Sequence, residues 1–550
     1  MTDAVHRYDP LDDGIFDWSK IPDITRTIPA LLEHGLKHHP DHDVLVFDDQ
    51  RITYAEAEAR SALLARHLLG AGVGKGSRVG MVFPNTPEFL VTFLAITRIG
   101  AVAVPMSTFS STRELHGMTR RADLVLLIAA DRYLNHDYVD RLATAFPSAA
   151  GQDAPLALPE APALRRIWIS EAGASWPPAY LAQSTPVAAS LLEAVEATVV
   201  PADPAAIIHT SGSTSEPKGV IHSHGTLLRQ ACKIAASYPW QGDDRVYTPM
   251  PFFWVGGLTL NLLNLMQYGG TVVTSSATAA RDLLDFIERE QATYVVAWPH
   301  TARAMASDPS FAGRDYSYMR GGVLFEALPP ERRPKAPFGQ ALGMSETAGP
   351  HHISPIELAD DLDGSFGTPM PGMELLLVDP STGEPLADDG SVGVLLVRGD
   401  CLMVGMVGQE RHQVLDADGW YRTGDLCSFR DGHLFYHGRV DDMIKSSGAN
   451  VSPREVEGVL MGLPGVFQAH VAGVPDAVRG SVVGAVLVPT TGTQLDAAWL
   501  RAEAARLLSS YKVPRVLVVM EAADLPSTSS TKVDRRAIAR LLHEAAKKAG

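Results

Sequence analysis

In the N-terminal part of the chain, apolar runs alternate with helix-periodic segments, and this order predicts strands and helices in turn. The apolar run at 78–83 (RVGMVF) is predicted to be a strand, followed by a helix over 86–99 and a strand over 101–104. Upstream, residues 53–56 (TYAE) have the spacing of a capping box at a helix start. A strand, a helix and a strand in this order predict a βαβ unit and a parallel sheet.

The same order recurs along the chain. The predicted elements are strands at 205–208, 271–274 and 293–297, with helices from about 225 and over 282–291. Beyond Gly367 the strands become shorter and are separated by turns, and the last hundred or so residues again mix strands and helices.

We therefore expect an α/β fold with two domains. The N-terminal domain, residues 1–438, would contain parallel-sheet βαβ subdomains and a small β-rich subdomain over about 367–438. A small, mobile α+β C-terminal domain, residues 439–550, would follow it. A chain of 550 residues also exceeds one typical hydrophobic core, which supports more than one domain.

Composition limits the classes of partner. The formal net charge is −16, with 20% charged and 46% apolar residues, and no long basic run occurs. Nucleic acids and anionic membranes are therefore poor candidates as partners. An acidic protein that binds an anionic ligand must do so through local donors.

Three widely separated cysteines, Cys232, Cys401 and Cys427, argue against a disulfide scaffold or a structural zinc site and suit a reducing cytoplasm. The first ten residues lack the apolar core of a secretory signal, and no uninterrupted apolar run reaches membrane-spanning length. We expect a cytoplasmic protein without an integral membrane segment. The oligomeric state is not readable, and a homodimer is left open.

The most informative motif is the run at 209–219 (HTSGSTSEPKG), directly after an apolar segment. It holds two glycines, five hydroxyl side chains and one lysine. A strand that opens into such a loop presents backbone N–H groups, hydroxyls and an ammonium to one small volume, which suits a polyphosphate. The spacing is not that of a Walker A loop. An ordinary flexible Ser/Gly turn is the alternative.

Two further motifs carry a carboxylate near a glycine. In the run 343–347 (GMSET), Glu346 lies beside hydroxyls and is suited to place Mg²⁺ against phosphate oxygens. The alternative is a helix N-cap with an acid in the first turn. In the run 420–425 (WYRTGD), Asp425 is suited to accept hydrogen bonds from two ribose hydroxyls, and an Asx-turn is the alternative.

Two charged segments lie nearer the C-terminus. The run 438–448 (GRVDDMIKSSG) is dense in charge between two domain-like regions, which indicates a hinge, or else a solvated turn. The run 526–532 (PSTSSTK) has one lysine in a hydroxyl-rich loop. A mobile cation there can neutralise charge that develops during attack on phosphorus. The alternative is a disordered surface loop.

In their order and spacing, these motifs resemble those of the adenylate-forming superfamily, which includes acyl-CoA synthetases, nonribosomal-peptide adenylation domains and beetle luciferases. The resemblance covers nearly the whole chain, from Thr53 to Arg535. Residues 210–219 resemble the family's phosphate loop, and residues 343–346 resemble its G-M-[ST]-E motif. Residues 421–425 match its Y-R-T-G-D motif, and residues 438–448 match G-R-x-D-D-x-I-K-x-x-G. Residues 526–532 match its P-x-T-x-x-x-K loop.

The resemblance implies an ATP-dependent acyl-CoA synthetase that forms an acyl-adenylate and then a CoA thioester, releasing pyrophosphate and AMP. The implied ATP contacts of the phosphate loop are Thr210, Ser211, Gly212, Ser213, Thr214 and Lys218. Around the second turn, Glu346 would position Mg²⁺, Thr347 would touch the α-phosphate, and Gly343 and Met344 would adjoin the nucleotide.

Further roles follow from the same resemblance. Asp425 would hold the ribose hydroxyls, with Arg439 nearby, and Lys532 would bridge the acid's carboxylate and the α-phosphate. The implied catalytic set is Lys532, Glu346, Thr210 and Lys218. Asp441 falls at the family's hinge position. Rotation there would withdraw Lys532 after adenylation and present Lys445 and Gly448 to a pantetheine channel.

The implied acid pocket contains Trp254, Val255, Gly321, Gly322 and Val323. Its apolar character favours a hydrophobic acid, aliphatic or ring-containing. The chain departs from the family's pattern at four positions: Trp254 stands where His is frequent, Leu342 where an aromatic often stacks on adenine, Thr531 where Gly is common, and His209 where Tyr is frequent. We infer that the ATP chemistry is retained and the acid pocket is unusual, although core packing is the alternative for Trp254.

Two other interpretations stay open at this point. The protein could be a stand-alone adenylation enzyme that loads a carrier protein, or a non-catalytic binding protein on the same fold. The sequence contains no fused carrier domain, which favours free CoA. Retention of the charged positions together argues against loss of activity: Lys218, Glu346, Asp425, Arg439 and Lys532.

Overall fold

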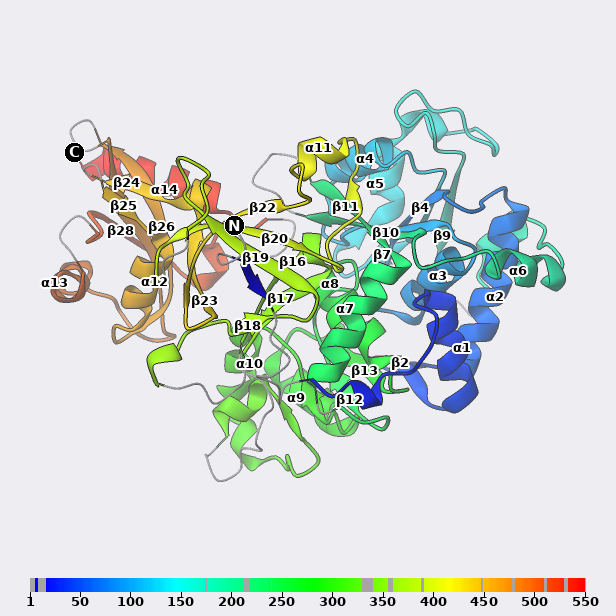
Figure 1. Cartoon of the computed structure of the whole chain (residues 1–550), viewed down its shortest axis with the longest axis horizontal. Helices are drawn as coiled ribbons and strands as arrows, with labels where there is room; N and C mark the ends of the chain where they lie inside the picture. Colours follow the sequence, from blue (N-terminus) through cyan, green and yellow to red (C-terminus); the bar gives the residue numbers. More distant parts are fainter. Residues whose placement is uncertain are drawn as a thin grey trace.

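The computed structural model is mixed α/β, with a large N-terminal part and a separate C-terminal part that is drawn in orange to red on the left of Figure 1. It describes residues 5–7, 16–171, 173, 176–210, 217–238, 240–328, 340–354, 360–386, 390–446, 449–476, 480–508, 512–528 and 533–549.

Two largely parallel sheets form the framework of the N-terminal part. In the described residues the first has seven strands in the order β21-β11-β10-β5-β4-β6-β9. Its strands are β4 (Arg78–Val82), β5 (Val102–Pro105), β6 (Leu126–Ala130), β9 (Arg166–Ser170), β10 (Pro204–Thr210), β11 (Lys218–Ser223) and β21 (Gly405–Met406). Neighbours from β10 to β9 pair in parallel, whereas β11 and β21 run antiparallel at one edge.

The second sheet has six strands among the described residues, in the order β15-β14-β12-β13-β2-β3. They are β2 (Asp43–Phe47), β3 (Gln50–Thr53), β12 (Arg245–Tyr247), β13 (Thr271–Thr274), β14 (Tyr294–Val295) and β15 (Gly321–Gly322). All pairs are parallel except the β2–β3 hairpin at the edge.

Helix α3 (Pro87–Arg98) joins the two sheets because it contacts β4 and β5 of one and β2 and β3 of the other. Every residue of α3 except Glu88 is buried. A helix that is apolar on all sides is expected only in such a fully enclosed position. The predicted strand, helix and strand over 78–104 are therefore confirmed as a βαβ unit.

The capping box predicted at Thr53 is also confirmed, because it begins α2 (Tyr54–Gly70). The Thr53 hydroxyl accepts the Glu56 backbone N–H at 3.2 Å, and the Glu56 carboxylate accepts the Thr53 N–H at 3.0 Å. Helix α2 packs on α3 and on α1 (Ile28–His38).

Between Gly367 and Arg439 the strands of the main sheet pair antiparallel. Short strands were expected here, and this was wrong for three of them, because Gly393–Gly399 and His433–Arg439 have seven residues each and Tyr421–Arg430 has ten. Strands β1 (Val5–Arg7), β19 (Met373–Val378), β20 (Gly393–Gly399), β22 (Tyr421–Arg430) and β23 (His433–Arg439) form one sheet in that order. Strands β16 (Ala341–Met344), β17 (Gly349–Ile353) and β18 (Thr368–Pro369) form a smaller sheet. The boundaries at 367 and 438 stay predictions.

The C-terminal part contains its own sheet with a separate apolar cluster that includes Val456, Leu487 and Leu500. In it, β24 (Ile444–Ser446), β25 (Ala449–Val451), β26 (Val466–Asp476), β27 (Gly480–Pro489) and β28 (Val516–Val519) pair around β27. Helices α12 (Pro453–Met461), α13 (Ala497–Leu507) and α14 (Arg535–Ala549) accompany this sheet.

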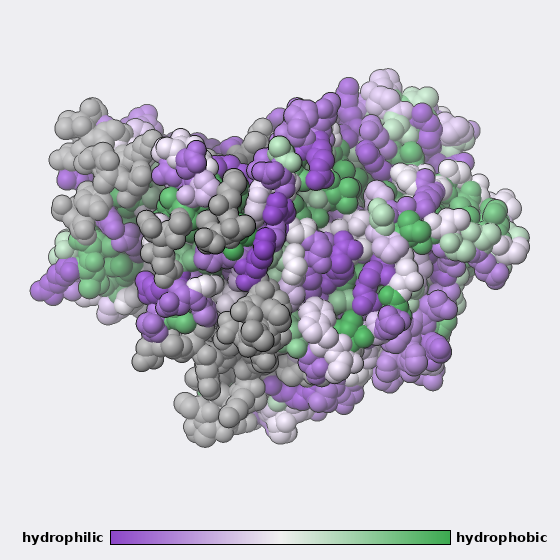
Figure 2. Space-filling view, viewed as in Figure 1, coloured by the Kyte–Doolittle hydropathy of each residue, from purple (hydrophilic) through white to green (hydrophobic). Residues whose placement is uncertain are grey.

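The remaining helices of the N-terminal part are α4 (Thr112–Arg121), α5 (Tyr138–Ala145), α6 (Ala189–Glu196), α7 (His224–Ser237), α8 (Val255–Gly257), α9 (Ala280–Arg289), α10 (Pro299–Ala306) and α11 (Arg411–Val414). On the face seen in Figure 2, polar residues separate the apolar ones into small patches. In the part of the chain that the structure describes, no helix is long and apolar enough to cross a membrane.

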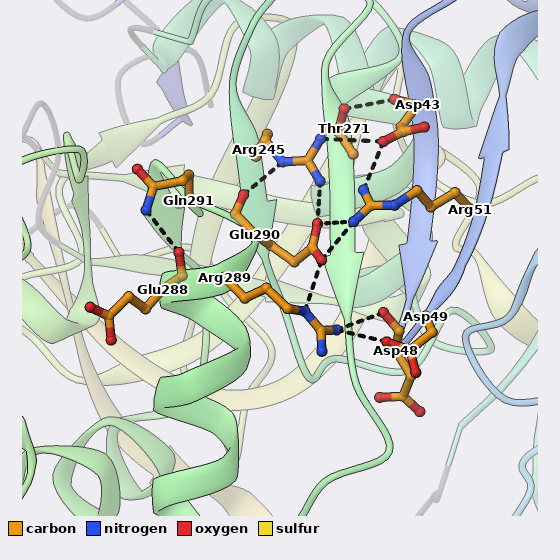
Figure 3. Close-up of polar contacts among 10 residues, drawn as sticks. All are labelled: Asp43, Asp48, Asp49, Arg51, Arg245, Thr271, Glu288, Arg289, Glu290 and Gln291. Atoms are coloured by element: carbon orange, nitrogen blue, oxygen red, sulfur yellow. Dashed lines mark hydrogen bonds and ion pairs between the residues drawn. The ribbon is translucent and has the colours of Figure 1, made fainter.

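One carboxylate joins helix α9 to two strands of the six-stranded sheet, β3 and β12. Glu290, at the end of α9, accepts hydrogen bonds from Arg51 at 2.8 Å, from Arg245 at 2.6 Å and from Arg289 at 3.2 Å (Figure 3). Burial alone raises the pKa of Glu290, but hydrogen bonds and charges from Arg51 and Arg245 outweigh it, so the pKa lies below its usual value. The carboxylate thus fixes the β2–β3 hairpin against β12.

The substitution Glu290→Gln is expected to lower the free energy of unfolding by about 1–3 kcal/mol, because charge-assisted hydrogen bonds are lost. Urea denaturation followed by fluorescence measures the change. Asp49→Asn is the matched control, because the Asp49 side chain is 92% exposed and pairs only with Arg289 among the described residues. Equal denaturation midpoints for the two variants would contradict the role of Glu290.

Candidate active site

Strands β10 and β11 bring two predicted phosphate-binding residues together. They pair antiparallel, with Thr210 opposite Lys218 and His209 opposite Gly219. The loop between them contains Ser211, Gly212, Ser213 and Thr214, which lie outside the described residues. The run at 209–219 therefore opens from one strand and returns directly into another, with Thr210 and Lys218 at its two ends.

Strand β11 also supports the turn that carries Glu346. The Nε2 of His222 donates to the backbone oxygen of Ser345 at 2.7 Å. Burial lowers the pKa of His222 to about 4, and the hydrogen bond opposes this only in part. A neutral imidazole therefore links β11 to the turn. Sequence reasoning missed this residue, because a single histidine in an apolar strand carries no local signal.

Glu346 itself lies in a short 3₁₀ turn (Ser345–Thr347) between β16 and β17. The Tyr421 hydroxyl donates to its Oε1 at 3.0 Å, and the Met403 N–H donates to its backbone oxygen at 2.8 Å. Both the side chain and the backbone of Glu346 are thus held by distant segments. Tyr421 was part of a recognised motif, but its contact with Glu346 was not anticipated.

The neighbours of Glu346 show how tight this turn is. A Cβ added to Gly343 would lie within 3.0 Å of the Gly349 backbone, so only glycine permits this approach of β16 to β17. Thr347 is fully buried, and its hydroxyl donates to the Gly349 oxygen at 2.7 Å. Its contact with an α-phosphate stays a prediction. Met344 and Leu342, both in β16, are half-buried.

Asp425 and Arg439 face each other across β22 and β23. The Arg439 Nε lies 3.4 Å from the Asp425 Oδ1. Burial raises the pKa of Asp425 to about 6; the charges of Glu346 and Asp442 add to this effect, and Arg439 opposes it. A carboxylate in such surroundings is stabilised by hydrogen-bond donors or by a cation. The structure therefore brings Glu346, Asp425 and Arg439 together.

The predicted acid-pocket residues follow two parallel strands of the second sheet. Trp254 precedes α8, which begins at Val255 and continues into a π-helix over Leu258–Leu263. The segment between β12 and Trp254 is fixed by Asn85, which donates to the Met250 oxygen at 2.9 Å and accepts the Phe252 N–H at 2.8 Å. Trp254 and Val255 are half-buried.

Gly321 and Gly322 form β15, which packs closely on β14. A Cβ on Gly321 would lie within 3.0 Å of the Tyr294 ring, and one on Gly322 would meet the Val295 backbone. Because β12 and β15 point the same way, Trp254 and Val323 leave the sheet at the same, carboxyl, edge. That edge is where ligands bind in open α/β sheets.

The predicted mobile elements are only partly described. Asp441 lies in a 3₁₀ turn (Val440–Asp442) directly after β23, and Lys445 lies in β24; their side chains are outside the described residues, as are Gly448, Thr531 and Lys532 in full. The ends of the Lys532 loop meet, because Ser527 and Val533 form a β-bridge.

Comparison with known proteins shows the family of this chain. Residues 32–407 match the family model described as AMP-binding enzyme, and residues 455–532 match its C-terminal domain. The chain belongs to this family of adenylate-forming enzymes, of the acyl-CoA synthetase type. It is therefore an enzyme of the acid–thiol ligase class, and it depends on ATP.

Two curated relatives illustrate the similarity. A 3-[(3aS,4S,7aS)-7a-methyl-1,5-dioxo-octahydro-1H-inden-4-yl]propanoyl:CoA ligase from Mycobacterium tuberculosis is 31% identical over 93% of this chain and 98% of its own. A feruloyl-CoA synthase from an Amycolatopsis species is 32% identical over 88% and 92%. A solved anthranilate CoA ligase in complex with anthranoyl-AMP shares the fold, with a TM-score of 0.80 and 23% identity over 96% of this chain and 100% of its own.

Buried histidines around the site predict acid sensitivity. Burial lowers the pKa of His209, His222 and His224 to about 4 and of His351 to about 3, and that of His352 lies well below 6.5. The unfolded chain takes up these protons more readily than the folded protein. The contribution of the neutral histidines to the free energy of unfolding is therefore fully present above pH 6.5 and falls as the pH drops from 6.5 towards 4. Each group contributes a slope of up to about 1.4 kcal/mol per pH unit.

Thermal denaturation between pH 7.5 and 4.5 measures this effect. His222→Gln keeps a donor for the Ser345 oxygen and removes one titrating group, so its melting temperature is expected to fall less steeply with acid. His412→Gln is the control, because the His412 side chain is 75% exposed. Parallel curves for the His222 variant and the wild-type protein would show that buried histidines do not set the acid sensitivity.

Proposed function

We propose that the protein joins a hydrophobic carboxylic acid to CoA through an acyl-adenylate, at the expense of ATP. The observation that carries this proposal is the cluster of Glu346, Asp425 and Arg439, which come from separate strands and turns. Thr210 and Lys218 pair at the two ends of the predicted phosphate loop. The carboxylates would bind a cation and the ribose hydroxyls, and the loop between Thr210 and Lys218 would bind the phosphates.

Glu346 is suited to position Mg²⁺ because Tyr421 occupies Oε1 with a single hydrogen bond. In the described residues, no group of three or more histidine, cysteine, aspartate or glutamate side chains could hold a metal ion alone. Mg²⁺ is commonly held by one or two carboxylates together with substrate phosphates and water, which fits this arrangement. Bound there, Mg²⁺ would supply positive charge to the departing pyrophosphate.

In the first half-reaction, an oxygen of the acid's carboxylate attacks the α-phosphorus of ATP. A new O–P bond forms, the α–β bridging bond breaks, and pyrophosphate leaves. Two anions must approach each other, so cationic groups are needed where charge accumulates. Lys532 would bridge the two anions, and Lys218, with Thr210 and the hydroxyls of Ser211, Ser213 and Thr214, would bind the β- and γ-phosphates.

In the second half-reaction, the sulfur of CoA attacks the acyl carbon, AMP leaves, and the thiol proton passes to solvent. The C-terminal domain (439–550) would rotate about Asp441 between the two steps, withdrawing Lys532. Lys445 and Gly448 would then line the channel for the pantetheine arm. Such a movement would exchange the groups of the C-terminal domain that face the acyl-adenylate, so that one site serves both half-reactions.

Trp254, Val255 and Val323 support a hydrophobic acid, because apolar side chains leave the second sheet at the edge where ligands bind. The names of the two relatives, which act on ferulate and on a bicyclic propanoate, favour a ring-containing acid over a straight chain. Gly321 and Gly322 let β15 pack directly on β14, since a Cβ at either position would clash with the Tyr294 ring or the Val295 backbone.

Formation of AMP from ATP and Mg²⁺ is expected to require an apolar acid and to rise strongly when free CoA is added. A panel of matched aliphatic and aromatic acids, each with and without CoA, measures this. Acid-dependent pyrophosphate release that CoA does not stimulate would instead indicate a carrier protein as acceptor. A folded protein inactive with every acid would indicate a binding role.

Lys532→Ala is expected to abolish formation of the acyl-adenylate and to leave thioester formation from a preformed acyl-adenylate largely intact, because the lysine acts only while two anions meet. Pyrophosphate release and thioester formation from synthetic acyl-AMP measure the two steps separately. Lys512→Ala, which removes a lysine paired with Glu455 in the same part of the chain, is the control. Equal loss of both half-reactions would show that the role given to Lys532 is wrong.

A further inference from the structure

Helix α7 contacts a turn that lies far along the sequence. Arg229 and Lys233 lie four residues apart on α7 and therefore on one face of the helix. Arg229 donates through Nε and Nη2 to the backbone oxygen of Asp400 at 3.0 and 2.8 Å. Lys233 forms an ion pair through Nζ with the Asp400 carboxylate. One helix face thus holds both the backbone and the side chain of Asp400.

Lys233 is unusual because its side chain is 6% exposed. A second contact of its Nζ is the Sγ of Cys401, at 3.1 Å. Burial raises the pKa of Cys401 to about 12, so this thiol is neutral and Asp400 supplies the negative charge. A buried ammonium is costly without such a partner, so removal of the Asp400 carboxylate, which is itself 42% exposed, would leave Lys233 buried without a counter-charge.

Asp400 is also fixed from the opposite side. Its backbone N–H donates to the Gly372 oxygen at 3.3 Å. A Cβ added to Gly372 would come within 2.8 Å of the Asp400 Oδ1, so the carboxylate packs directly on the backbone there. The turn at Asp400 is therefore held between α7 and the segment that enters β19.

Residues 400–407, the connecting segment, run from this turn to both ends of the proposed ATP site. The Met403 N–H donates to the Glu346 oxygen at 2.8 Å, and the Val407 N–H donates to the Gly219 oxygen, next to Lys218, at 2.9 Å. Between them β21 pairs with β11. The connecting segment therefore holds the backbone both at the carboxylate proposed for Mg²⁺ and next to the lysine proposed for phosphate.

We infer that Lys233 and Asp400 are positioning residues for the nucleotide: their ion pair fixes the connecting segment, which holds Glu346 in register with Lys218. The inference rests on the proposed function for the identity of the ligand, ATP with Mg²⁺. Neither residue touches the reacting atoms. Both act through the backbone of the connecting segment.

The chain contains a second buried cation that serves for comparison. Arg98 on α3, with a side chain 7% exposed, pairs with Glu58 of α2 and Glu196 of α6. These contacts join three helices, and among the described residues no hydrogen bond or ion pair links the three side chains to the connecting segment or to the Glu346 turn. If buried ion pairs mattered only for stability, Arg98 and Lys233 variants would behave alike.

The test uses the full-length protein and the variants Lys233→Met, Asp400→Asn and Arg98→Met. Calorimetric titration with ATP and Mg²⁺ gives Kd without any acid, and steady-state assays give KM for ATP, acid and CoA. Lys233→Met and Asp400→Asn are expected to raise Kd and KM for ATP on the order of 10-fold, as loss of a supporting contact does at metal sites. KM for acid and KM for CoA should each change less than about twofold, which is smaller than the effect expected if the lost contact were coupled to those sites.

Arg98→Met is expected to lower the melting temperature and leave the Kd for ATP unchanged. The double variant Lys233→Met/Asp400→Asn should bind ATP no more weakly than the worse single variant, because both remove one interaction. Lys233→Arg, which keeps the charge, should restore part of the ATP affinity. An unchanged Kd in folded Lys233→Met, or equal rises in all three KM values, would overturn the inference.

The outcomes separate this inference from the proposed function. If wild-type protein binds ATP but forms no AMP with any acid, the ligase function fails while the Kd comparison still decides the role of Lys233. If wild-type protein is an active ligase and Lys233→Met binds ATP as tightly as it does, only the positioning role fails.

Discussion

Negative charge gathered around one buried carboxylate is the constraint on which the nucleotide end of this protein depends. Asp425 is 7% exposed, and its pKa is raised to about 6 by burial first and then by the charges of Glu346 and Asp442. Arg439 offsets part of this effect, and Tyr421 donates a hydrogen bond to Glu346. Such an arrangement is costly in isolation and becomes favourable when donors and a cation arrive with a ligand.

The fold holds these groups in place through buried elements. Strand β11 leaves the phosphate end and passes directly into α7, which is buried on nearly all sides. Through His222 the same strand holds the turn before Glu346, and through Lys233 the same helix holds the segment that reaches Glu346 from the other side. Both ends of the proposed nucleotide site thus depend on one strand and helix, which sit in the main apolar core.

Much of the fold could be predicted from local pattern. The strand at Thr271–Thr274 and the capping box at Thr53 were found at their observed positions, because periodicity and capping are properties of neighbouring residues. Strand β11 was missed: its residues, KGVIHS, begin with Lys-Gly, and its pairing with β10 and β21 is decided by tertiary contacts.

The residues of the candidate site likewise divide into those that local sequence motifs identified and those that only tertiary contacts reveal. Motifs identified Glu346, Asp425 and Arg439, which the structure brings together. The groups that hold Glu346 were not found, because His222, Met403 and Tyr421 come from segments at least 57 residues away along the chain. A buried lysine in an apolar helix gives no sequence signal for its partner either. The roles of Ser211, Gly448 and Lys532 stay predictions, since they lie outside the described residues.

A crystal structure of the protein with ATP and Mg²⁺ tests the central claim most directly. The account predicts that the ribose hydroxyls lie within hydrogen-bond distance of Asp425 and that Mg²⁺ lies beside Glu346. It also predicts that the β- and γ-phosphates lie at the loop between Thr210 and Lys218. A nucleotide bound elsewhere, with Asp425 and Glu346 free of it, would contradict the account.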